Sequence, residues 1–214
     1  MKRIKLLTLL VLISLMMAPV ANAGTFGVNG LVTVPTADML NPTELNLTYQ
    51  HIGDGDLILG SYGLKEGLEV GGVAQWPNGL DDDGENYLLV KVNVLKEDAN
   101  YMPEMSLGIV DRNLYLVASK STNFYGIRAH LGVADKAMNM IGDRVFLGIN
   151  KVLNPVTISS GDGSFNMPTT TVAVEYNDGI NLGANLDFGS GISADLGVLD
   201  FDEFTFGINF KNKF

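Results

Sequence analysis

Short segments in which apolar and polar residues alternate with a period of two dominate this chain. In residues 203–214, EFTFGINFKNKF, Phe204, Phe206, Ile208 and Phe210 alternate with polar or small residues. Residues 44–52, ELNLTYQHI, and residues 180–188, INLGANLDF, show the same pattern. Because successive side chains of a β-strand point to opposite faces, this period predicts strands with one apolar and one polar face.

Turn sequences separate these segments from residue 44 to the end of the chain. Asn177-Asp178-Gly179 and Gly189-Ser190-Gly191 are strong hairpin turns, because Gly and Asn tolerate positive φ. We therefore expect one all-β domain over residues 44–214, with about twelve strands and a range of about ten to fourteen. The expected strands are 44–52, 56–62, 67–76, 86–95, 105–110, 113–119, 124–133, 144–151, 170–176, 179–188, 191–199 and 203–212. The long connection 152–169 indicates either a miscounted strand or a further strand within 156–166.

The start of the chain has the features of an export signal. Basic residues within residues 1–5 precede an apolar run at 6–17, and an A-x-A cleavage site ends at Ala23. The run is shorter than the roughly 20 residues that span a bilayer as a helix. We expect residues 1–23 to be a cleaved signal peptide rather than a membrane anchor. Their removal leaves 11 basic and 24 acidic residues, a net charge of −13, which argues against nucleic acid as a partner.

The polar faces of the strands decide between two all-β architectures. They combine many glycines and amides with charges of both signs, as in the small interior of a barrel. The charged or titratable residues that we expect to line the lumen are Glu69, Lys91, Arg128, His130, Arg144, Glu175, Asp187, Asp195 and Lys211. With no Cys to form disulfides, this pattern favours an antiparallel up-and-down transmembrane β-barrel whose apolar face meets lipid. A soluble periplasmic β-sandwich that binds a ligand is the alternative.

Closure of the barrel would pair the last strand with residues 44–52, which removes an aggregation-prone edge. The ending also resembles the signal recognised by the bacterial outer-membrane barrel assembly machinery, at Phe206, Ile208, Phe210 and Phe214. This resemblance implies location in the bacterial outer membrane, with outer-membrane lipid and the assembly machinery as partners.

A second resemblance lies near the start of the mature chain. Residues 30–49, GLVTVPTADMLNPTELNLTY, and residues 61–72, SYGLKEGLEVGG, resemble the YjbH family of outer-membrane proteins, as do residues 174–186. That family is associated with exopolysaccharide production and export. The resemblance implies a link to surface polysaccharide, with polysaccharide as a candidate partner.

Residues with catalytic or metal-binding potential are few. His51 and His130 both lie on expected strands, and no neighbouring Ser completes a recognisable motif, so we expect no enzymatic activity and no cofactor. An outer-membrane lipid hydrolase is the third hypothesis. Asp81, Asp82, Asp83 and Glu85 form an acidic run with oxygen ligands for Ca²⁺. Their spacing does not match an EF-hand loop, which favours a solvated turn.

Residues 24–43 precede the first expected strand. Within them, PTADML is compatible with one helical turn. We expect this segment to lie against the periplasmic mouth as a cap or to enter the lumen as a plug. The predicted function is therefore structural, envelope-related or passive transport, through a charge-lined lumen that is either plugged or narrowly conducting.

Overall fold

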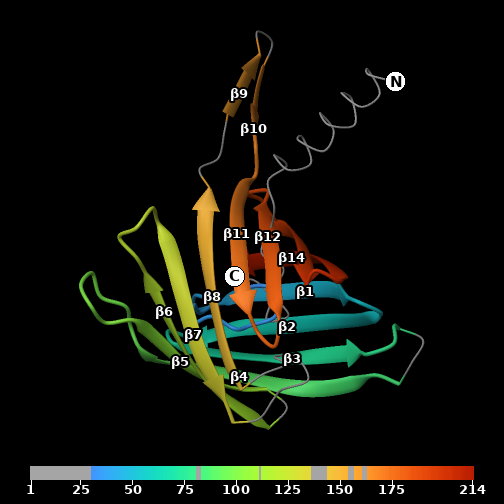
Figure 1. Ribbon diagram of the computed structural model, residues 1–214. Coiled ribbons are helices and arrows are strands. Elements are labelled where there is room, and N and C mark those ends of the chain that lie inside the picture. Colours follow the sequence, from blue (N-terminus) through green and yellow to red (C-terminus); the bar gives the residue numbers. More distant parts are fainter. Residues whose placement is uncertain (1–29, 81–82, 111, 136–143, 154–156, 161–162) are drawn as a thin grey trace.

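Twelve antiparallel strands close on themselves into one barrel (Figure 1). The computed structural model describes residues 30–80, 83–110, 112–135, 144–153, 157–160 and 163–214. The barrel strands are β1 (Glu44–Ile52), β2 (Gly55–Lys65), β3 (Leu68–Trp76), β4 (Glu85–Leu95), β5 (Glu104–Val110), β6 (Asn113–Ser121), β7 (Ile127–Ala134), β8 (Val145–Leu153), β11 (Thr169–Tyr176), β12 (Ile180–Asp187), β13 (Ile192–Leu199) and β14 (Glu203–Lys213). The expected barrel class is confirmed, and a two-sheet sandwich is excluded.

The seam of the ring joins the first and last strands, as their sequences predicted. β1 pairs with β14 from Glu44 opposite Lys213 to Ile52 opposite Thr205. Beyond the seam, the Phe214 N–H donates to the Thr43 carbonyl at 3.0 Å, and the Thr43 hydroxyl donates to the Phe214 carbonyl at 2.6 Å. We call the end where β1 begins and β14 finishes the terminal rim, and the opposite end the distal rim.

The long connection between β8 and β11 contains two further strands that do not join the ring. β9 (Thr157–Ser160) and β10 (Gly163–Asn166) pair only with each other. This hairpin projects away from the barrel wall at the terminal rim (Figure 1). A strand within 156–166 was therefore a correct expectation, and the number of barrel strands stays at twelve.

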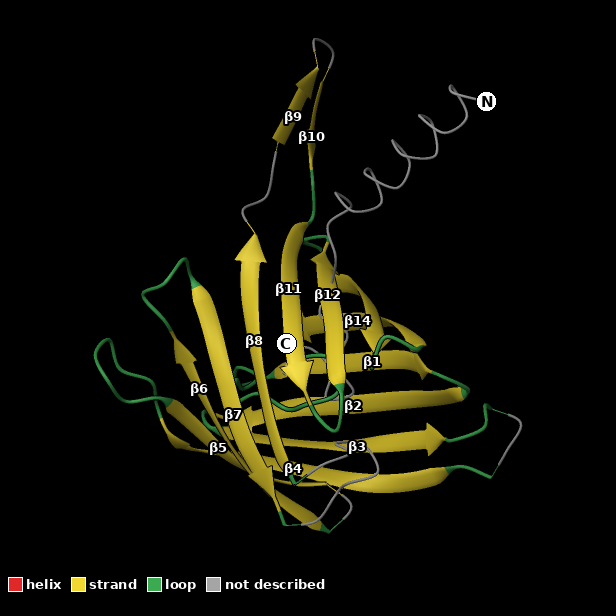
Figure 2. Cartoon of the chain, viewed as in Figure 1, coloured by secondary structure: helices red, strands yellow, loops and turns green. Residues whose placement is uncertain are grey.

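One strand start differs from the sequence prediction by more than one residue. Residues 124–133 were expected as a strand, but β7 begins at Ile127. Tyr125 and Gly126 both have positive φ, 51° and 69°, so they form a turn in front of the strand. Strands joined by loops and turns make up the described chain (Figure 2). Among the described residues, no helix has the length and apolarity to cross a membrane.

The outward face of the barrel is apolar and exposed along most of the ring. Neighbouring strands contribute outward Leu, Val, Ile and Phe side chains, and few polar residues interrupt them. Among the exposed apolar residues are Leu47, Ile58, Leu88, Val90, Leu107, Ile109, Leu131, Leu147, Ile149, Val174, Leu182, Leu196, Phe206, Ile208 and Phe210. A continuous apolar surface of this extent calls for an apolar environment around it.

The lumen is lined differently on its two sides. Strands β11–β14 and β1 form a polar wall of amides, hydroxyls and carboxylates, which includes Asn46, Thr48, Gln50, Glu175, Asn181, Asp195, Thr205 and Asn209. Strands β2–β8 form a mixed wall that is polar near the terminal rim and apolar near the distal rim. Its apolar cluster contains Leu57, Leu59, Val73, Leu89, Val110, Tyr115, Val117 and Phe146. The expected charged or titratable residues of this half, Glu69, Lys91, Arg128 and His130, lie in its polar part, and the sequence analysis did not predict the apolar cluster beside them.

Two glycines of the mixed wall make room for aromatic rings. A Cβ on Gly108 would lie 2.1 Å from the Tyr115 ring, and a Cβ on Gly132 would lie 2.1 Å from the Phe146 ring. Each ring therefore extends over the paired glycine of the neighbouring strand. At Gly108 and Gly132 the accommodated groups are thus aromatic.

Replacing Gly132 by Val should destabilise the barrel by about 1–3 kcal/mol, the usual cost of overfilling a packed interior. The matched control is Gly72→Val on β3, where an added Cβ meets only the Tyr87 carbonyl oxygen at 3.5 Å. Urea unfolding in detergent micelles measures both free energies of unfolding. Equal losses in the two variants would contradict the packing of Phe146 against Gly132.

Candidate functional site

Residues 30–42, which we call the inner segment, run inside the barrel before β1 begins. At their start the chain makes a tight turn, in which the Leu31 N–H donates to the Val34 carbonyl at 2.9 Å and Gly30 bridges to Pro35. The tip of this turn, residues 31–34, is buried, and Leu31 and Val34 join the apolar cluster of the mixed wall. The segment thus occupies the lumen instead of lying across a mouth.

A single carboxylate on the polar wall receives the tip. Glu175 of β11 is 1% exposed and accepts hydrogen bonds from the backbone N–H groups of Val32, Thr33 and Val34 at 2.9, 2.7 and 3.3 Å. The Thr33 hydroxyl and the Asn181 amide also donate to Glu175, at 2.5 and 2.9 Å. Hydrogen bonds to a charged acceptor are roughly twice as strong as neutral ones, so Glu175 is the principal polar anchor of the tip.

Three glycines shape the wall around the same tip. A Cβ on Gly148 would lie 2.2 Å from a methyl carbon of Leu31. A Cβ on Gly183 or Gly197 would lie 2.4 or 3.0 Å from the methyl carbons of Val32. Any larger residue at Gly148 or Gly183 would collide with the tip. These glycines of β8, β12 and β13 form a socket that fits the Leu31 and Val32 side chains.

Toward the terminal rim, polar side chains of the mixed wall hold the rest of the inner segment. The Ala37 N–H donates to the Ser119 hydroxyl, and the Ser106 hydroxyl donates to the Ala37 carbonyl, both at 2.8 Å. The Leu40 N–H donates to Glu69 at 3.2 Å. The Lys91 ammonium donates to the Asp38 carbonyl. Backbone groups that would otherwise be buried without partners are satisfied in this way.

Arg128 centres an ionic cluster at the terminal rim. Its guanidinium contacts Asp38 of the inner segment at 2.8 Å, Glu104 at 3.0 Å, and Glu97. Burial alone would raise the pKa of Glu97, but the bonds from Arg128 and the Ser121 N–H outweigh it and lower that pKa. Because a depressed carboxyl pKa gives stability above its unfolded value, this contribution is lost as the pH falls through the folded pKa of Glu97.

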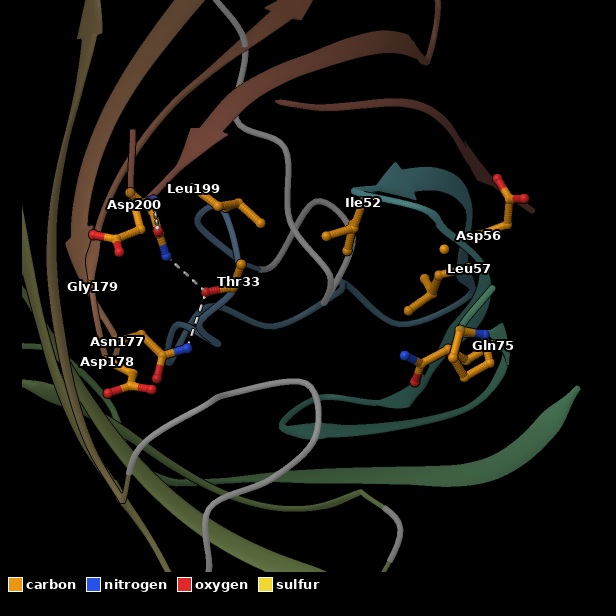
Figure 3. Close-up of a pocket in the computed structure, with 13 residues that line it drawn as sticks. Thr33, Ile52, Asp56, Leu57, Gln75, Asn177, Asp178, Gly179, Leu199 and Asp200 are labelled. Carbon is orange, nitrogen blue, oxygen red and sulfur yellow. Dashed lines mark hydrogen bonds between the residues drawn. The ribbon is translucent and has the colours of Figure 1, made fainter. Parts of the chain in front are cut away.

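The lumen opens at the distal rim into a cavity of about 390 Å³. Figure 3 shows Asn177, Leu199 and Asp200 on one side and Ile52, Leu57 and Gln75 on the other, with Thr33 of the tip between them. The amides of Asn177 and Asn181 donate to the Thr33 hydroxyl at 3.1 and 3.3 Å. Thr33 of the tip is therefore part of the lining of this cavity.

Of the expected lumen residues, six lie on the inner wall within the barrel. They are Glu69, Lys91, Arg128, His130, Glu175 and Asp195, all buried or half-buried. Asp187 and Lys211 lie at the terminal rim around a separate cavity of about 290 Å³. Arg144 is exposed on the distal rim because β8 begins only at the next residue, so its placement in the lumen was wrong.

The two histidines have different surroundings. His51 lies on the outer face near the distal rim, where its Nδ1 is 3.0 Å from Asp56 and its ring packs 5.2 Å from that of Phe206. His130 faces the lumen, with Nδ1 2.8 Å from the Ser119 hydroxyl and Nε2 3.4 Å from the side-chain amide oxygen (Oδ1) of Asn150.

The row formed by Ser119, His130 and Asn150 brings together a nucleophile, a base and an amide. Both Ser119 and His130 are buried on the lumen side, and the Ser119 oxygen already accepts the Ala37 N–H. Lipid outside the barrel has no access to this row, so it gives no support to lipid hydrolysis. Its observed contact is with the inner segment.

The remaining candidate residues that the structure describes lie on the surface. Asp81 and Asp82 of the acidic run are outside the described residues, and Asp83 and Glu85 are exposed. Within the described part of the chain, no group of three acidic, His or Cys side chains is arranged to hold a metal ion. The assembly-signal residues Phe206, Ile208, Phe210 and Phe214 all point outward and are exposed.

Sequence reasoning missed the residues that link the wall to the inner segment. Thr33, Ser106 and Ser119 are small hydroxyl residues with no local signature. The inward parity of Ser106 and Ser119 on their strands was the one available signal. The pairing of Glu175 with residues 32–34 spans more than 140 positions, and no local pattern predicts it.

Comparisons with known proteins give no family assignment. No protein-family model matches the chain, and no curated protein matches it. The resemblance of residues 30–49 to the YjbH family therefore stays a prediction.

Several solved structures are similar in outline. The KdgM porin in complex with disordered oligogalacturonate has a TM-score of 0.45 and 13% identity, over 80% of this chain and 99% of that one. The outer membrane protein Omp33 of Acinetobacter baumannii has a TM-score of 0.42 and 10% identity, over 80% and 97%. A mutant porin of Rh. blastica has a TM-score of 0.28 and 13% identity, over 79% and 98%. With TM-scores below 0.5, these likenesses say nothing further about this chain.

Replacing Glu175 by Gln should loosen the tip, because an amide turns one of its two hydrogen-bond acceptors into a donor. We expect the backbone amides of residues 32–34 to exchange about 10- to 100-fold faster, since bonds to a charged group contribute roughly 1.5–3 kcal/mol. Hydrogen exchange with mass spectrometry measures this. The matched control is Asp195→Asn on the same wall, whose carboxylate bonds to Asn185 and Asn209 instead. Equal protection of residues 32–34 in the Glu175 variant and the unmodified chain would refute the anchor.

Proposed function

We propose that this chain is an outer-membrane barrel with a passive transport role, and that its inner segment closes the lumen at rest. The observation that carries the proposal is the seating of the inner segment at two levels. Its tip lies in the Glu175 carboxylate and the glycine socket. Its following residues are bonded to Ser106, Ser119 and Lys91.

The outer surface supports insertion into a bilayer. Outward apolar side chains cover the middle of the strands, and polar ones gather near the rims, with His51, Asp56 and Asn86 at the distal rim and Lys120, Lys151 and Asn212 at the terminal rim. An apolar band bounded by polar or aromatic residues is the outer surface of a transmembrane barrel. In water, the same band would promote aggregation.

The lining of the lumen supports a channel that can open. Tyr115 and Phe146 lie against Gly108 and Gly132, so their rings follow the wall instead of crossing the lumen. The inner segment fills the space between this wall and the polar wall, and its tip meets both. Withdrawal of the segment would therefore join the distal cavity to the terminal rim along the polar wall.

Export and the family resemblance belong to the same proposal. Residues 1–23 would act as the cleaved signal peptide; they lie outside the described residues. The YjbH-like stretch, residues 30–49, comprises the inner segment and most of β1. We infer that this resemblance reflects a barrel with a seated inner segment.

A contribution to exopolysaccharide export is a second proposal, which the polysaccharide yield of a deletion strain would test.

Cell fractionation tests the location. We expect the chain in the outer-membrane fraction, with faster gel migration before boiling than after, because a closed barrel resists detergent until it is heated. Replacing Leu182 on the outer face by Arg should lower stability in vesicles by about 2–4 kcal/mol if that position lies near the bilayer midplane. Recovery of the chain wholly from the soluble periplasmic fraction would exclude the membrane proposal.

Planar-bilayer conductance tests closure by the inner segment. We expect deletion of residues 24–40 to raise the single-channel conductance well above that of the full chain. Unchanged conductance after the deletion would remove the closure proposal.

A reversible lock is available for the full chain. A Cβ on Gly183 would lie 3.5 Å from the Cβ of Val32, within the range of about 3.5–4.5 Å that disulfides require. The chain has no Cys, so Val32→Cys with Gly183→Cys creates a unique pair. In planar bilayers, channel openings of the full chain with this pair should disappear on oxidation and return on reduction. The variant with Val32→Cys alone should respond to neither treatment.

A further inference from the structure

The polar wall carries carboxylates along its length. Glu175 of β11 and Asp195 of β13 are each 1% exposed and lie at different heights in the lumen. Asp178 and Asp200 line the cavity at the distal rim, and Asp187 lies at the terminal rim. The basic residues of strands β11–β14 and β1 are Lys211 and Lys213, both at the terminal rim. The middle and distal parts of this wall are therefore acidic.

The mixed wall does not compensate that charge. Lys91 lies opposite Glu69 on the neighbouring strand, and both side chains face inward. Arg128 is paired with Glu104 and Glu97. These two inward-facing cations are thus matched by carboxylates on the same side of the barrel, and the excess negative charge of the lumen stays on the opposite side.

In the seated arrangement the inner segment covers one of these carboxylates, Glu175. The backbone N–H groups of residues 32–34 point at Glu175 and supply the positive ends of three peptide dipoles. When the segment withdraws, these donors leave with it, and the donor that stays is the Asn181 amide. The withdrawal that opens the lumen therefore also exposes a fixed negative charge in it.

We infer that the open lumen passes small cations in preference to anions, with Glu175 as the residue that sets this preference. Rings or rows of carboxylates favour cations in a pore, because a narrow lumen with low-dielectric walls focuses their field. A cation entering from the distal rim meets Asp178 and Asp200 first and Glu175 next. The same carboxylate is thus the anchor of the tip when the lumen is closed and the selectivity charge when it is open.

This inference rests on the proposed function, and one bilayer experiment separates the two. The variant lacking residues 24–40 is measured under a KCl gradient, with K⁺ and Cl⁻ as the probes. We expect a reversal potential near the K⁺ equilibrium potential. Adding Glu175→Gln should shift it clearly toward zero. Adding Glu66→Gln, in the exposed turn between β2 and β3, should leave it unchanged.

The outcomes have distinct meanings. A deletion variant that inserts but does not conduct overturns the proposed function. A variant that conducts with a reversal potential at zero or on the chloride side overturns the cation inference alone, as does a Glu175→Gln variant with unaltered selectivity. If the deletion variant does not fold, the full chain with Gly183→Leu takes its place, because the larger side chain displaces Val32 from its socket. The same reversal potentials are expected there.

Discussion

The carboxylate of Glu175 is the interaction on which the rest of the lumen depends. A carboxylate buried to this extent is unfavourable unless charge or hydrogen bonds compensate it. The compensation here comes from a turn in which consecutive backbone N–H groups converge on one point, an arrangement known to bind anions. The buried Glu175 carboxylate requires the N–H donors of the inner segment, and the segment requires this carboxylate as the acceptor for its N–H groups. Wall and segment therefore stabilise each other.

At the glycines of β8, β12 and β13, the barrel wall and the inner segment are also complementary in shape. Glycine weakens a strand because it contributes no side chain to packing. At Gly148 and Gly183, the missing side chains are replaced by Leu31 and Val32 from the inner segment. The barrel wall is thus completed by residues that are not part of it.

Much of the fold follows from local pattern, and the parts that did not are informative. Alternation placed Glu175 and Asp195 on the inner face, because strand parity is a property of neighbouring residues. The pairing of β1 with β14 followed from the need to remove a sheet edge by closure. It could not assign the consecutive apolar residues Leu57, Ile58 and Leu59, two of which turned out to line the lumen. Arg144 was misplaced because parity holds only where a strand exists. The socket was out of reach, since its contacts join residues more than a hundred positions apart.

The two hydrogen bonds between Thr43 and Phe214 have a consequence for the order of assembly. Thr43 is where the inner segment leaves the lumen, and it is bonded to Gly63 of β2 as well as to the last residue of the chain. Two of these three hydrogen bonds form only when β14 has paired with β1. In a barrel that still lacks its final strand, the site for residues 31–34 is incomplete. The apolar side chains of these residues then stay exposed until β14 has paired.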